Sequence, residues 1–169
     1  MDANALRAMQ APLKDRYKGD PKAAYITLRA KGTLDDAHIA CKVETGRALA
    51  VAGLHPATGG SGLELCSGDM LLEALVACAG VTLKAVSTAL DIPLKSAKVS
   101  AEGDLDFRGT LGVDKAAPVG FADIRLRFDV ESDAPQEKLD QLLKLTERYC
   151  VVYQTLKGGP PVSVKLERA

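Results

Sequence analysis

The chain has 169 residues, of which 47% are hydrophobic and 26% are charged, proportions that are typical of a globular protein. This length suits one domain with a single core, and we expect one domain over residues 1–169, with residues 1–20 as an N-terminal helical extension. The 22 basic and 22 acidic residues cancel, which argues against nucleic acid or an anionic membrane as the main partner.

The first part of the chain predicts one helix and three short strands. Residues 4–17 have a helical composition and are followed by a Lys-Gly-Asp-Pro stop signal. Apolar and polar residues alternate over 23–30 and 38–46, and residues 47–54 have the pattern of a third strand. We expect these strands to form one antiparallel meander. The glycine-rich loop 55–69 follows, and a long loop of this kind is typical of a functional or mobile segment.

Residues 70–92 form the longest apolar segment and predict a helix. Glu73 and Lys84 interrupt this segment, which favours a helix buried on most sides over a membrane span. We expect Ser67 or Asp69 to cap its start. The N-terminus carries no apolar signal core, so we expect a cytoplasmic protein whose cysteines rest as thiols.

The second half of the chain predicts a hairpin, a helix and a last strand. Residues 98–107 and 121–130 alternate between apolar and polar side chains and predict a long hairpin. Residues 132–150 predict an amphipathic helix with Asp133 as its N-cap, and residues 161–168 predict a closing strand. The resulting order, β-β-β-α-β-β-α-β, indicates an α+β fold: an antiparallel sheet with a buried central helix and a second helix.

The four cysteines show no Cys-x-x-Cys spacing, so we expect no structural disulfide framework. Cys78 lies within the apolar helix, and at ~100° per residue Cys150 falls on the apolar side of the second helix. If both helices pack on one sheet, the two thiols can meet, either as plain core packing or as one redox pair. Cys41 alternates with apolar strand residues and is assigned to the core. Cys66 precedes the central helix, beside the positive end of its dipole, and its role stays open.

Two stretches resemble motifs of the OsmC/Ohr family, named for an osmotically inducible protein and for organic hydroperoxide resistance proteins. GDMLLEALVACAGVTL, residues 68–83, is similar to the family's central helix, in which an acidic motif leads into an apolar run with a cysteine. ERYCVVYQTL, residues 147–156, is similar to the second cysteine motif, and the element order agrees over residues 24–168. Val151 stands where many relatives have proline, so the chain resembles a divergent branch. The resemblance implies an OsmC-like fold and an intertwined homodimer, with the central helices buried between subunits and active sites lined by both chains.

The resemblance also implies a thiol-dependent peroxidase that needs no cofactor. Cys78 would be the peroxidatic cysteine, which attacks an organic hydroperoxide, releases an alcohol and becomes a sulfenic acid. Cys150 would be the resolving cysteine, which closes a Cys78–Cys150 disulfide that an external thiol or dithiol then reduces. An apolar setting favours organic hydroperoxides over hydrogen peroxide, because each buried methylene of the substrate contributes ~0.8 kcal/mol.

This chemistry requires a group that stabilises the thiolate. A thiol with a pKa of ~8.5 is only a few per cent ionised at neutral pH, and apolar burial lowers that fraction further. The resemblance implies a cation, held by an acid, that reaches Cys78. Asp69 matches the acid most closely, and Arg29, Arg47 and His55 are the candidates for the stabilising group.

Two other interpretations stay open at this stage. The chain could be a non-enzymatic protein of the same fold that binds a small apolar ligand or senses redox state, because neither role needs a thiolate-stabilising group. A metal site would draw on Cys66, Cys78, Cys150 and His55, but their spacing matches no zinc pattern, so we expect no metal.

Overall fold

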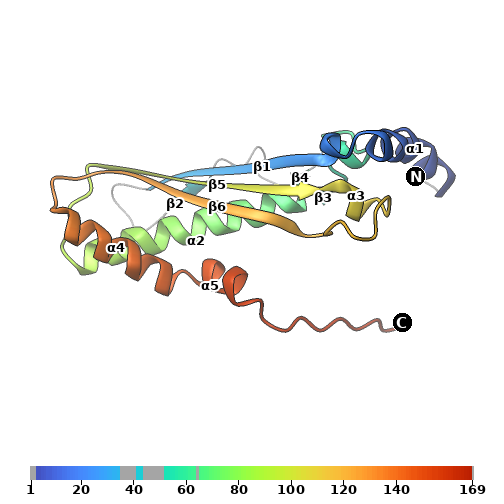
Figure 1. Cartoon of the computed structure of the whole chain (residues 1–169). Helices are drawn as coiled ribbons and strands as arrows, with labels where there is room; N and C mark the ends of the chain where they lie inside the picture. The colour runs from blue at the N-terminus through green and yellow to red at the C-terminus, as the bar shows by residue number, and fades with distance from the viewer. Residues whose placement is uncertain (1–2, 35–40, 44–51, 64, 169) are drawn as a thin grey trace.

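The computed structural model describes residues 3–34, 41–43, 52–63 and 65–168. A four-stranded antiparallel sheet runs in the order β2-β1-β5-β6 and carries the helices of residues 67–89, 136–149 and 151–158 on one side (Figure 1). Its strands are β1 (Tyr25–Leu34), β2 (Cys41–Val43), β5 (Ser96–Asp106) and β6 (Phe121–Glu131). This mixture of helices and antiparallel sheet confirms the predicted α+β class.

The hairpin β5–β6 forms as the alternation of its residues predicts. Val99 and Ala101 are buried on the inner face of β5, whereas Glu102 on the outer face pairs in register with Arg125 of β6. Gly103 is required on the inner face, because a Cβ at this position would lie 2.5 Å from the ring of Phe121. The sheet therefore has one apolar face, which packs on helices, and one charged face.

The central helix α2 (Ser67–Ala89) packs on the apolar face of the sheet (Figure 1). Its N-cap is Cys66, which makes no side-chain capping bond, so the prediction that Ser67 or Asp69 caps the helix is wrong. Leu72, Leu75 and Val76 are fully buried in the core beneath β5. Among the described residues, α2 alone is long and apolar enough to cross a membrane; here it packs as the core helix of the sheet.

The second helix begins later than predicted and is broken in two. It starts at Gln136 as α4 (Gln136–Tyr149), with Pro135 at the N-cap position. Asp133 therefore caps nothing and instead accepts a hydrogen bond from Lys95 at 2.7 Å. The chain then straightens at Cys150 (φ −71°, ψ 104°) and resumes as α5 (Val151–Gly158). The paired β-branched residues after the break disfavour an uninterrupted helix.

The predicted meander is only partly formed. β1 and β2 pair antiparallel, as expected. The third segment contributes β3 (Ala52–Gly53), which pairs parallel with β4 (Leu65–Cys66) in a separate two-stranded sheet, so it does not extend the meander. The parts of these predictions at 38–40 and 44–51 lie outside the described residues.

Short helices and a terminal helix complete the chain. α1 (Ala3–Gly19) leads into the 3-10 turn η1 (Pro21–Ala24), and a second 3-10 turn, η2 (Pro56–Thr58), follows β3. A short helix, α3 (Phe107–Thr110), opens the connection between β5 and β6. α1 thus forms most of the predicted N-terminal extension.

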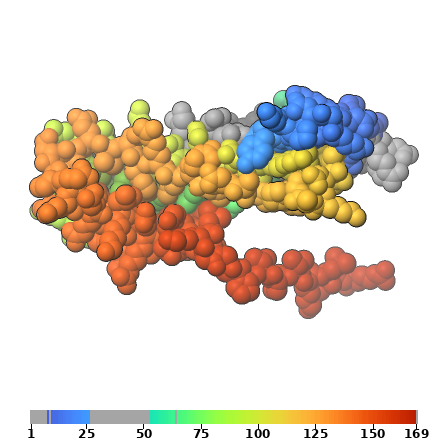
Figure 2. Space-filling model, in the orientation of Figure 1, coloured from blue at the N-terminus to red at the C-terminus, as the bar shows by residue number. Residues whose placement is uncertain are grey.

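The closing strand predicted at 161–168 is not formed in the single chain. This segment is extended but pairs with no strand, and it stands clear of the body of the molecule (Figure 2). Val162, Val164 and Leu166 are 84%, 94% and 95% exposed. Alternating apolar residues with this exposure indicate a strand whose neighbour is absent from one chain.

Candidate functional site

The packing of α2 against the α4–α5 break brings two thiols together. Cys78 lies at the middle of α2 and is half-buried, whereas Cys150 at the break is only 1% exposed. The Cys150 thiol lies next to Cys78, close enough for each to influence the ionisation of the pair. Cys150 was expected on a helix face, and it lies instead between two helices. Its burial is as the sequence indicated, and its contact with Cys78 is one that the sequence allowed but did not determine.

The surroundings of the thiol pair are apolar. Cys150 belongs to the buried cluster that Leu72, Leu75, Val76, Ala79, Val99 and Ala101 form with it, and Cys78 packs against this cluster. Burial raises the pKa of Cys150 to about 11, and the adjacent Cys78 acts in the same direction. The amides of Tyr153 and Val152 lower it in part, although neither makes a full capping bond to the sulfur. Cys150 is therefore a neutral thiol at neutral pH.

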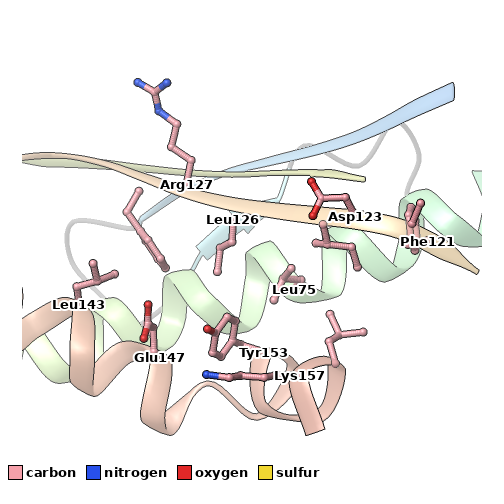
Figure 3. Close-up of a pocket in the computed structure, with 13 residues that line it drawn as sticks. Leu75, Phe121, Asp123, Leu126, Arg127, Leu143, Glu147, Tyr153 and Lys157 are labelled. Carbon is pink, nitrogen blue, oxygen red and sulfur yellow. The ribbon is translucent and has the colours of Figure 1, made fainter. Parts of the chain in front are cut away.

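A groove of about 810 Å³ lies beside this cluster, between β6 and the helices α4 and α5 (Figure 3). Leu75, Leu126 and Tyr153 line it, and all three also pack in the cluster that contains the cysteines. The ammonium group of Lys157 lies 5.7 Å from the centre of the Tyr153 ring, whereas Arg127 points away from the helices (Figure 3). The groove thus offers an apolar surface close to the thiol pair.

His55 is held in one orientation at the start of η2. Its Nδ1 accepts a hydrogen bond from the Ala57 amide at 3.0 Å, and its ring stacks on Phe107 with centroids 5.0 Å apart. Burial lowers the pKa of His55, and the charge of Asp69 opposes this shift. Because Nδ1 is an acceptor, the neutral imidazole carries its proton on Nε2.

Asp69 lies in the first turn of α2, close enough to His55 to influence its charge. It also raises the pKa of Glu73, although burial is the larger cause of that shift. Nine residues of α-helix separate Asp69 from Cys78, which is about 14 Å along the axis. The structure therefore brings His55 and Asp69 to each other, but within one chain it places them at the mouth of α2, away from the thiol pair.

The remaining candidates occupy other places. Arg29 pairs in register with Glu102, a position on the charged face of the sheet, away from α2. Arg47 lies outside the described residues. Cys66 is half-buried at the N-cap of α2. In the described part of the chain, no three His, Cys, Asp or Glu side chains gather in a group that could hold a metal ion.

Sequence reasoning missed the contacts that hold the His55 loop. The Tyr17 hydroxyl of α1 donates a hydrogen bond to the Ala57 carbonyl at 2.7 Å. At the start of α3, the carboxylate of Asp106 accepts hydrogen bonds from the backbone amide and the guanidinium group of Arg108. Arg108 holds the pKa of Asp106 below its usual value. This acid-held arginine stabilises the loop that carries Phe107 and is not part of the thiol site. No local sequence signal marks the Tyr17–Ala57 bond, which joins residues 40 positions apart in the chain.

Comparison with known proteins agrees with this architecture. Residues 60–165, well over half of the chain, match the family model for OsmC-like proteins. The crystal structure of an OsmC-like hydroperoxide resistance protein from Jannaschia sp. CCS1 has a similar fold, with a TM-score of 0.56 and 17% sequence identity over 83% of this chain and 91% of that chain. No curated protein matches the sequence. The matched segment contains both cysteines of the thiol pair, α2 and the β5–β6 hairpin, and on this evidence the chain belongs to the OsmC-like family.

Proposed function

We propose that this protein is a thiol-dependent peroxidase that reduces organic hydroperoxides to alcohols. The observation that carries the proposal is the adjacent pair of Cys78 and Cys150 in an apolar setting. Membership of the OsmC-like family and a fold shared with a hydroperoxide resistance protein support the same reaction class.

Cys78 is the attacking residue in this proposal, because it is the more exposed residue of the two. Its thiolate attacks the distal oxygen of the hydroperoxide, the O–O bond breaks, and the alkoxide leaves and takes a proton to become the alcohol. Cys78 is then a sulfenic acid. Cys150 loses its proton and attacks the sulfur of that sulfenic acid as a thiolate. The S–OH bond breaks, the hydroxyl group takes up a proton and leaves as water, and the Cys78–Cys150 disulfide closes.

Reduction of this disulfide completes the cycle. An external thiol or dithiol donates two electrons by thiol–disulfide exchange, and no metal or organic cofactor takes part. A reducing compartment such as the cytoplasm supplies thiols of this kind, so we propose a cytoplasmic location.

The substrate is a hydroperoxide with an apolar substituent. The groove beside the thiol pair is lined by apolar side chains such as Leu75, Leu126 and Leu156, and each methylene buried there adds ~0.8 kcal/mol to binding. A substituent of four or five carbons would thus bind several hundredfold more tightly than hydrogen peroxide, about 200- to 700-fold, when each carbon is fully buried.

We further propose a homodimer. The exposed apolar residues of the C-terminal segment, together with Leu71 and Val81 on the outer face of α2, leave apolar surface uncovered in one chain. A second copy would cover this surface, and it would allow Asp69 and His55 at the mouth of one α2 to act toward the active site of the partner. In the dimer these two residues would help to hold the group that stabilises the Cys78 thiolate.

A consumption assay tests the proposal. Wild-type protein with a dithiol should consume cumene hydroperoxide, Cys78→Ser should not, and Cys150→Ser should complete one turnover at most with a dithiol that cannot reduce the sulfenic acid. If wild type consumes peroxide no faster than Cys78→Ser, the enzyme proposal fails.

The alternative is a non-enzymatic member of the family that binds a small apolar ligand or senses redox state. The groove beside the thiol pair favours the ligand-binding alternative, because binding an apolar ligand needs only the apolar surface of the groove. In this case the Cys78→Ser variant should bind an apolar ligand as well as wild type does, and neither should turn over peroxide.

A further inference from the structure

His55 is the centre of the hydrogen bonds that shape the loop after β3. Its carbonyl oxygen accepts bonds from the amides of Thr58 and Gly60, at 2.8 Å and 3.1 Å, and from the Thr58 hydroxyl at 2.8 Å. Its Nδ1 accepts from the Ala57 amide at 3.0 Å, and its ring stacks on Phe107. The backbone bonds close the turn without the ring, whereas the ring alone joins the Ala57 amide to Phe107.

The bond from Ala57 exists only while the imidazole is neutral. Nδ1 accepts because the proton of the neutral ring is on Nε2, whereas the imidazolium ion carries a proton on each nitrogen and accepts none. Protonation would therefore place two N–H donors face to face across 3.0 Å. A half-turn of the ring about its Cβ–Cγ bond would put a C–H group in the place of Nδ1, and this group is no acceptor either. The charged ring thus has to move away from the Ala57 amide.

Titratable side chains reach the surroundings of this ring from three helices. They are Tyr17 of α1, Asp69 and Glu73 of α2, and Asp106 and Arg108 at the start of α3. Asp106 and Arg108 bind each other, and the Tyr17 hydroxyl donates to the Ala57 carbonyl. Burial lowers the pKa of His55, and the charge of Asp69 opposes this shift. Asp69 is therefore the anion that attracts the ring once it is protonated.

We propose that His55 is a pH-sensitive cap of this loop: the neutral ring holds the Ala57 amide and stacks on Phe107, and the protonated ring leaves both and turns towards Asp69. The step adds one proton to Nδ1, breaks the bond from the Ala57 amide and brings the imidazolium ion to the carboxylate. Burial lowers the pKa of His55 from its ordinary value of ~6.5, so the change takes place on the acidic side of that value. Its effect on peroxide reduction rests on the proposed function, in which His55 and Asp69 help to stabilise the Cys78 thiolate.

A second copy of the chain leaves these contacts in place. Both partners of the neutral ring, Ala57 and Phe107, belong to the same chain as His55. The change needs only a proton from water and no larger reagent, so a partner that covers the outer face of α2 does not block it.

Nuclear magnetic resonance of the full-length protein tests the proposal. The chain has two histidines, and His38→Gln identifies the ring signals of His55. At pH 7.5 the ring nitrogens should show a proton on Nε2 and none on Nδ1. Between pH 7.5 and pH 4, Nδ1 should take up a proton and the ring-current shift from Phe107 should disappear. The protection of the Ala57 amide against hydrogen exchange, relative to its intrinsic rate at each pH, should fall about tenfold or more over the same range.

Two variants separate this change from a general loosening in acid. In His55→Asn the side-chain oxygen can accept the same bond and does not titrate, so the Ala57 amide should stay protected at both ends of the range. In His55→Ala the acceptor is missing, and the amide should be unprotected throughout. The proposal is overturned by a His55 ring that stays neutral down to pH 4, by an Ala57 amide that stays protected after Nδ1 is protonated, or by an equal loss of protection in His55→Asn.

Asp69→Asn tests where the protonated ring goes. Without the carboxylate the charged ring loses its attraction, so the midpoint of the His55 titration should move to lower pH; an unchanged or higher midpoint would overturn the proposal. None of these measurements uses peroxide. A protein that shows the titration and the loss of protection but consumes no hydroperoxide would count against the proposed function and leave this inference standing.

Discussion

The pH dependence of disulfide closure follows from the burial of Cys150. Its pKa of about 11 means that about one molecule in ten thousand carries the thiolate at pH 7, since the ionised fraction falls tenfold for each pH unit below the pKa. The thiolate is the reactive form. We therefore expect closure of the Cys78–Cys150 disulfide to accelerate about a hundredfold between pH 7 and pH 9.

The measurement is a rapid-mixing experiment with one equivalent of cumene hydroperoxide. Samples are quenched in acid at successive times, alkylated, and analysed for the disulfide by mass. Cys150→Ser serves as the control, because it reports the pH dependence of sulfenic acid formation alone. A closure rate that is independent of pH, or that levels off below pH 8, would show that Cys150 ionises near neutrality and would refute the reasoning from its burial.

Three further substitutions probe the elements that support the site. Asp106→Asn should lower the free energy of unfolding by about 2 kcal/mol at pH 7, because a buried carboxylate that binds Arg108 is lost. The pKa of Asp106 is lowered in the folded state, so its contribution is fully present above about pH 4 and is lost as the pH falls through the folded pKa. In urea unfolding, the difference between variant and wild type should therefore be smaller at pH 3 than at pH 7. Gly103→Val should cost about 1–3 kcal/mol in the same assay, since its side chain would overlap the ring of Phe121; an unchanged unfolding midpoint would contradict this packing. Val164→Asp should shift the dimer toward monomer in gel filtration, and a wild-type protein that elutes as a monomer would exclude the proposed dimer.

The parts of the fold that local pattern determines were predictable. The alternation of residues 98–107 and 121–130 anticipated β5 and β6, because a strand with one buried face needs an apolar residue at every second position. The apolar run at residues 70–92 anticipated α2, because a helix that is buried on most sides needs apolar residues around most of its circumference. The burial of Cys150 was also anticipated, but the prediction assumed that Cys150 continues the preceding helix. In the structure Cys150 is not helical, because α4 ends before it and α5 begins after it.

The parts that depend on distant contacts were not predictable. Nothing near His55 indicates that its ring stacks on Phe107, and nothing near Tyr17 indicates its bond to Ala57. The C-terminal segment illustrates a different limit. Its alternation is that of a strand, but a strand forms only where an edge receives it, and the pattern does not say which chain provides that edge.

The most direct test of the central claim is to find which cysteines one equivalent of an organic hydroperoxide joins. The account predicts that two of the four thiols disappear and that trypsin releases a single linked species, residues 48–84 joined to 149–157 through Cys78 and Cys150. A protein that keeps all four thiols, or in which Cys78 is oxidised to a sulfinic acid while Cys150 stays free, would contradict the account.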